Sequence, residues 1–235
     1  MFFRSQSVLE QAHIASALVF ELSKVQTPHV RSAVVSQLRV IDEELGQRVA
    51  KGLGLSPVPD AVQPAVPVQD LPVSPATRII DRMKHTLEGR CVAILVDEGS
   101  NAESVAAMRK ALEAAKASVK LIAPRLGGIT LSDGKEAAID GQLAGSPSAQ
   151  FDAVASIIPL ESGKKLAKHA AAQNWFRDAF GHLKAIAACK GTHAILDAAG
   201  VKPDAGVVDP SDTKAFGKAA VSRFWEREPA LRSLA

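Results

Sequence analysis

The sequence predicts an α/β protein in which a helical hairpin and a proline-rich linker precede a doubly wound, mostly parallel sheet. After about residue 90, apolar runs of strand length alternate with amphipathic stretches of helix length, the pattern of strands joined by crossover helices. Before residue 55, apolar residues recur at steps of three and four, and residues 56–75 hold six prolines. We therefore expect three regions: 1–55, 56–75 and 76–235.

The N-terminal region shows signals for two helices. Ser7 and Glu10 have the Ser-x-x-Glu spacing of a capping box, which predicts a helix over 8–24. Thr27 and Pro28 suit the start of a second helix, whose apolar periodicity continues to about Gly52. Each helix has one apolar stripe and buries little area alone, so we expect the hairpin to pack against further protein.

The linker and the region after it differ sharply in pattern. The prolines of the linker favour an extended backbone, and its Val and Leu residues indicate that it lies along a surface. Residues 127–150, rich in Gly, Ser and Asp, interrupt the alternation and predict a hairpin excursion. The expected helices are 76–87, 102–116, 164–180 with a break, 192–199 and 212–226, and the expected strands are 91–96, 118–123, 153–159, 185–189 and 207–208.

Composition narrows the function classes. The net charge is +3 and the basic residues are spread along the chain, so we expect no nucleic-acid partner. The apolar runs are far shorter than the roughly 20 residues of a membrane span, and the N-terminus lacks the order of a signal peptide. We therefore expect no membrane partner, a cytoplasmic location, and free thiols at Cys91 and Cys189. The chain has no tyrosine, which excludes a Tyr oxygen as nucleophile or haem ligand.

Two loops at the carboxyl ends of predicted strands hold candidate chemistry, because doubly wound sheets bind ligands there. One is the acidic turn over 97–103; the other carries Cys189 between a strand and a helix. A helix N-terminus and the adjacent Lys190 favour a thiolate, and His193 follows four residues later. The alternative is that Cys189 is a small apolar residue of the core. The histidines and glycines match no zinc, Walker or dinucleotide motif.

Several segments resemble one family. They are Phe2-Phe3-Arg4-Ser5-Gln6, Glu10-Gln11-Ala12-His13-Ile14, Phe20-Glu21-Leu22-Ser23-Lys24-Val25 and Arg39-Val40-Ile41-Asp42-Glu43-Glu44-Leu45, and after the linker Val92-Ala93-Ile94-Leu95, Ser132-Asp133-Gly134 and His182-Leu183-Lys184. They look like the last helices and the C-terminal domain of the large-subunit, monofunctional haem catalases of the hydroperoxidase II type.

That resemblance implies a parent enzyme that disproportionates hydrogen peroxide as a defence against oxidative stress. Its haem, held by a distal His and Asn and a proximal Tyr, lies on an upstream barrel domain that this chain lacks. We therefore expect no cofactor and no metal in this chain, haem in the parent only, and no catalase activity of the chain alone. The partners that the resemblance implies are the catalase core domain and a homotetramer.

The C-terminal domain of these catalases is flavodoxin-like and similar to class I glutamine amidotransferases and PfpI-type proteases. Members of that superfamily carry a nucleophilic Cys on a strand-to-helix elbow, which Cys189 matches, and an acid on the first loop, which Glu103 matches. Lys190 stands where many members have His, and Pro159-Leu160-Glu161 replaces the glycine pair of the oxyanion pocket. These departures leave Cys189 and Glu103, with Lys190 and His193 as neighbours, as vestigial or redox candidates.

Three functions follow, in this order. The first is a structural role in which the chain stabilises the parent catalase, its oligomer and the access channel to its haem. The second is a holdase-like chaperone module that binds unfolded client proteins through apolar surface. The third is redox or electrophile sensing at Cys189.

Overall fold

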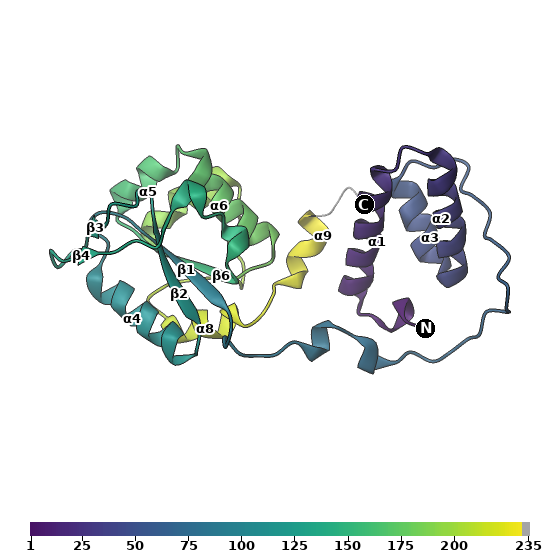
Figure 1. Ribbon diagram of the computed structural model, residues 1–235, viewed down its shortest axis with the longest axis horizontal. Coiled ribbons are helices and arrows are strands. Elements are labelled where there is room, and N and C mark those ends of the chain that lie inside the picture. The colour runs from purple at the N-terminus through teal and green to yellow at the C-terminus, as the bar shows by residue number, and fades with distance from the viewer. Residues whose placement is uncertain (232–235) are drawn as a thin grey trace. The chain divides into compact units, whose positions relative to one another are not determined.

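The computed structural model describes residues 1–231 (Figure 1). The chain forms two compact units. The helical unit comprises Met1–Met83 together with the segment that begins at Glu226, and the sheet unit comprises Lys84–Trp225. Within the described residues, no helix combines the length and the hydropathy that a membrane crossing requires.

Helix α1, Val8–Ser23, follows the short 3-10 turn Phe3–Ser5 and confirms the predicted capping box. The Glu10 amide donates to Ser7 Oγ at 3.3 Å, and the Ser7 amide donates to Glu10 Oε2 at 2.9 Å. Both amides would otherwise lack a partner at the start of the helix. The first turn of α1 is therefore fixed by its own side chains.

The predicted helix over 28–52 is wrong as a single element. It is divided into α2, Pro28–Ile41, and α3, Glu43–Gly52, by Asp42, whose backbone is extended at φ −162° and ψ 126°. The Asp42 carboxylate accepts the Leu45 amide at 3.1 Å and so caps α3. The chain turns back there, and the three helices enclose a core of their own, made of Ala15, Leu22, Val35, Leu38, Leu45, Val49 and Ala50.

The linker is extended, as predicted, but the helix expected over 76–87 is wrong. Only two 3-10 turns form there, Pro75–Thr77 and Ile80–Arg82, and neither has a buried residue. Part of the linker lies on the helical unit, where the Val62 amide donates to the Ser36 carbonyl at 3.2 Å. Its apolar side chains point largely into solvent at Val62, Val66, Val68, Leu71 and Val73.

The sheet unit is built on six parallel strands in the order β5-β2-β1-β6-β7-β8. Their bounds are β1 Cys91–Val96, β2 Ser118–Ala123, β5 Gly141–Gln142, β6 Ala153–Ile157, β7 Ile186–Ala188 and β8 Val207–Val208. Val92 pairs with Val119 on one side and with Ala153 on the other. The chain order therefore reverses at β1, which makes the gap between β1 and β6 the switch point of the sheet.

Helices cover both faces of this sheet (Figure 1). Side chains of β1 alternate between the two cores: Val92, Ile94 and Val96 enter one, and Ala93 and Leu95 enter the other. The first core receives α4, Ala102–Ala114, and α8, Thr213–Ala220. The second receives α5, Leu160–Leu166, α6, Ala170–Gly181, and α7, His193–Ala199. Burial on both faces explains why β1 reads as an unbroken apolar run.

Two further helix boundaries differ from the prediction, and the excursion holds one more strand than the predicted hairpin. The helix expected to continue to Glu226 ends at Ala220, and a 3-10 turn, Trp225–Arg227, and α9, Glu228–Leu231, follow it. Helix α5 starts at Leu160, directly after β6, rather than at Lys164. The excursion contains the predicted hairpin, formed by β3, Ile129–Thr130, and β4, Glu136–Ala137, and also the edge strand β5.

Candidate functional site

A cavity of about 460 Å³ lies where the strands β1, β6, β7 and β8 end. The loops after all four strands contribute to its walls, as the topology predicts for a ligand site of a doubly wound sheet. The lining residues are Gly99, Asn101, Ser104, Ile157, Ile158, Pro159, Leu160, Cys189, Lys190, Gly191, Asp209, Pro210 and Ser211. Cys189 and Lys190 therefore share one site, as the sequence indicated.

The thiol of Cys189 is half-buried and engaged by the protein. Its sulfur accepts the Ile158 amide at 3.4 Å, donates to the Ile158 carbonyl at 3.3 Å, and lies 3.3 Å from the Thr192 hydroxyl. The Thr192 hydroxyl also bonds to Ser156, and both residues are fully buried. Cys189 has an ordinary extended backbone, φ −75° and ψ 170°, without the strain typical of a nucleophile elbow.

Helix α5 packs against the turn after β7 through a close approach of two glycines. A Cβ atom on Gly163 would lie 1.6 Å from the Gly191 carbonyl oxygen, and one on Gly191 would lie 2.4 Å from the Ile158 carbonyl oxygen. Only glycine fits at either position. The segment that replaces the oxyanion glycines, at Pro159, is thus packed against the turn that carries Cys189.

The acidic loop after β1 is engaged with the excursion hairpin instead of the thiol. Glu98 accepts the Thr130 amide at 2.9 Å, and the Gly99 amide donates to the Thr130 carbonyl at 2.8 Å. Glu103 is exposed on the first turn of α4. Glu103 is not among the described residues that line the cavity, so the structure does not place it beside Cys189 in that cavity.

Sequence reasoning missed one acid of the cavity, Asp209. Its carboxylate accepts the Ser211 amide at 2.8 Å. Hydrogen bonds from Ser211 lower the pKa of Asp209, and the charges of His193 and Lys190 lower it further. His193, the first residue of α7, is thus connected to the cavity by its electrostatic interaction with the Asp209 carboxylate. The predicted strand over 207–208 pointed to the loop that carries Asp209, because that loop follows a strand end.

The residues present do not fit a haem. The resemblance implies a proximal tyrosine, and the chain contains none. Within residues 1–231, no three His, Cys, Asp or Glu side chains are grouped so that they could hold a metal ion. We therefore derive no haem chemistry from this chain's residues. Cys91 and Cys189 are both free cysteines.

Comparison with known proteins gives two matches to family models. Residues 1–53 match the model of catalase-related immune-responsive domains, and residues 88–229 match the model of the C-terminal domain found in long catalases. The second match covers more than half of the chain. The chain belongs to the long-catalase family. Its six-stranded parallel sheet with flanking helices is the fold of the C-terminal domain in that family.

Long catalases from several bacteria are similar over nearly the whole chain. Catalase C of Rhizobium meliloti (strain 1021) is 40% identical over 238 residues, which cover 98% of this chain and 34% of that protein. Catalase HPII of Pseudomonas putida is 35% identical, with 100% of this chain and 33% of that protein covered. Catalase-2 of Bacillus subtilis (strain 168) is 30% identical, with 97% and 33% covered. The chain thus spans about a third of the length of these relatives.

Proposed function

We propose that the chain acts as the C-terminal region of a large haem catalase, where it stabilises the subunit and its oligomer and carries none of the peroxide chemistry. The observation that carries this proposal is the exposed apolar surface of the helical unit. Val8 is 81% exposed, Phe20 62% and Phe2 61%. Side chains of this size are costly to leave in water, so they favour contact with the catalase core domain.

The contacts of the Cys189 thiol support the same proposal. The Cys189 sulfur has protein partners, α5 packs tightly against the turn that follows Cys189, and the loop acid Glu98 is bound to the hairpin. Nucleophilic catalysis needs a base beside the nucleophile and free donors for an oxyanion. This arrangement favours a structural domain over a hydrolase.

Truncation of the full-length catalase that carries this chain tests the proposal. Removing residues 1–235, the helical and sheet units together, should lower the temperature of half-inactivation of peroxide disproportionation and shift the tetramer toward smaller species in analytical ultracentrifugation. The rate per haem at low temperature should remain close to that of the intact enzyme. A Cys189→Ser variant of the intact enzyme is the matched control and should behave as the wild type. An unchanged inactivation temperature in the truncated enzyme would contradict the stabilising role.

A holdase-like activity is the second candidate, and the linker favours it. Five Val and Leu side chains between residues 62 and 73 are at least 45% exposed, on a backbone that prolines keep extended. Such a segment offers apolar contacts to an unfolded client. Suppression of the aggregation of a heat-labile client, lost when Val66, Val68 and Val73 are changed to Ser, would support this activity. Equal suppression by the serine variant would refute it.

A further inference from the structure

Two consecutive turns of α1 bind the two chain segments that connect the helical unit to the sheet unit. The chain leaves the helical unit after Met83 and re-enters it at Glu226. On the helical side of the first connection, residues 74–82 lie against the start of α1, and on the helical side of the second, α9 contacts the same helix. Glu10 contributes contacts to the first segment, and His13 contributes a contact to the second.

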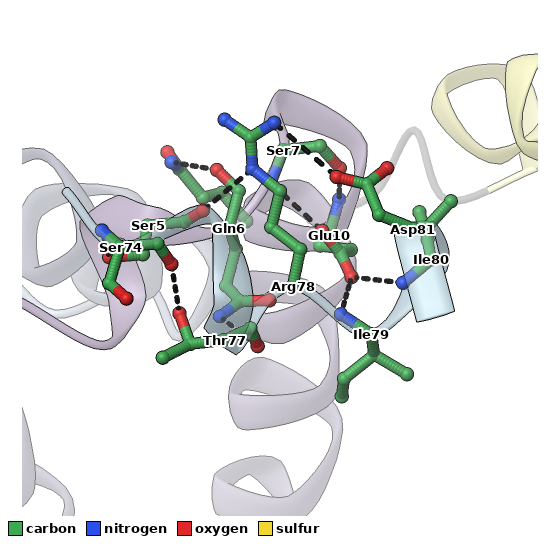
Figure 2. A network of polar contacts seen from close by, with 11 residues as sticks. Ser5, Gln6, Ser7, Glu10, Ser74, Thr77, Arg78, Ile79, Ile80 and Asp81 are labelled. Carbon is green, nitrogen blue, oxygen red and sulfur yellow. Dashed lines mark hydrogen bonds and ion pairs between the residues drawn. The ribbon is translucent and has the colours of Figure 1, made fainter. Parts of the chain in front are cut away.

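The first connection is held by a carboxylate. Glu10 is 7% exposed, and its Oε1 accepts the amides of Ile79 and Ile80, each at 2.9 Å (Figure 2). Its Oε2 accepts the Ser7 amide and so belongs to the capping box of α1. Three neighbouring hydrogen bonds also attach this segment to the start of the chain. The Ser74 amide donates to Ser5 Oγ at 2.8 Å, Gln6 Nε2 donates to the Thr77 carbonyl at 3.2 Å, and Arg78 Nε donates to the Ser5 carbonyl at 2.9 Å.

The second connection is held by the residue three positions further along α1. His13 Nδ1 bonds to Glu228 Oε1, and Glu228 is 1% exposed although it is acidic. Residues three apart on a helix lie on neighbouring turns of the same face. Glu10 and His13 therefore face one side of α1, and each binds one of the two connections.

These attachments are polar, and the apolar cores lie elsewhere. Ile79 is 69% exposed, and among the described residues the core of the helical unit takes no member from 74–82 or from 226–231. Both cores of the sheet unit consist of residues between Leu87 and Phe224. Releasing the connections would expose little apolar surface, which is the condition for local opening without global unfolding.

We propose that Glu10 and His13 form a double clasp, in which Glu10 governs both connections and His13 only the second. Glu10 binds the linker and, through Ser7, also orders the first turn of α1. Loss of that turn disturbs His13 on the next turn. When the clasp opens, residues 79–80 and α9 lose these attachments to α1, while the fold of each unit persists.

Limited trypsin digestion of the full chain, followed by mass spectrometry, tests the double clasp. Cleavage after Arg78 reports the first connection, and cleavage after Arg227 reports the second. Glu10→Gln should raise both cleavage rates at least about tenfold, because each rate follows the open population. His13→Ala should raise cleavage after Arg227 alone. Glu43→Gln, a change at an exposed acid of α3, is the matched control and should raise neither.

A second variant separates the clasp from the capping box. Ile79→Pro removes one amide that Glu10 accepts and leaves Ser7 and Glu10 in place; the preceding Arg78 is already extended at φ −68° and ψ 137°, as a residue before proline requires. It should speed cleavage after Arg82 but not after Arg227. If Glu10→Gln raises the cleavage rate after Arg78 but not after Arg227, the two attachments are independent and the double clasp is refuted. Faster cleavage within α2 or α3 would also refute it, since it would mean that the helical unit unfolds.

Discussion

Lys184 makes the sheet unit less stable at neutral pH than at alkaline pH. Lys184 is only 5% exposed, and its ammonium donates to the carbonyls of Ser148 at 2.7 Å and Ala149 at 3.3 Å. Burial lowers the pKa of Lys184 from 10.5 to about 8; repulsion by Arg223 adds to the shift, and attraction by Asp152 opposes it. In the unfolded chain the amine keeps its ordinary pKa, so the unfolded state binds more protons between these values.

The sign and size of the effect follow from that difference. Where the unfolded state binds more protons, the free energy of unfolding rises with pH. The gap between 10.5 and about 8 corresponds to roughly 3 kcal/mol over the whole window, of which about 2 kcal/mol falls between about pH 7.5 and about pH 9.5. The chain contains no tyrosine, so no phenol contributes to the pH dependence.

Urea unfolding followed by Trp175 fluorescence, in a Trp225→Phe background, measures this rise. Trp175 is 2% exposed in the core of the sheet unit and so reports on that unit. The free energy of unfolding of the wild type should rise by about 2 kcal/mol between about pH 7.5 and about pH 9.5, and Lys184→Met should not show this rise. Lys110→Met, a change at an exposed lysine of α4, should keep it. Parallel pH profiles for the wild type and Lys184→Met would refute the reasoning.

Two further predictions concern close packing and acid stability. Gly163→Ala places a methyl group 1.6 Å from the Gly191 carbonyl and should cost at least about 2 kcal/mol in urea unfolding, whereas Gly217→Ala, with open space around it, should cost nothing. If the free energy of unfolding of Gly163→Ala equals that of the wild type, α5 can move away from the turn without cost and the reasoning is refuted. Burial raises the pKa of Glu10, but amide bonds, those of Ser7 and Ile80 first, outweigh burial and lower it below 4.5. Its stabilisation of the helical unit should be complete above pH 4.5 and fall as the pH drops further, a loss visible by circular dichroism and absent in Glu10→Gln.

The sequence predicted the elements whose local signals agree with their environment. The strand Cys91–Val96 is buried on both faces, so an apolar run was enough to find it, and Ser7 with Glu10 marked the start of α1. The break at Asp42 was missed because the apolar periodicity continues across it while the chain reverses direction. The helix expected over 76–87 failed for a tertiary reason, since two of its amides are bound by Glu10, which lies far away in the sequence.

The candidate site was only partly predictable. Position after a strand end identified Cys189 and Lys190 as cavity residues. The partners of the Cys189 sulfur, Ile158 and Thr192, depend on how α5 packs, and no local pattern encodes the contact between Gly163 and Gly191. The roles of Cys189 and Glu103 remain predictions, with the measured reactivity of the thiol as their test.

The contact between the two glycines also limits how this fold can acquire new chemistry. Any side chain at Gly163 or Gly191 forces α5 away from the turn after β7, so useful variation must come from other positions around the cavity. The loops after β1 and β8 offer Ser104 and Ser211 on walls that face the same space. A directed-evolution library should therefore randomise those two loops and keep α5 constant, which treats the helix as scaffold and the opposite rim as the evolvable part.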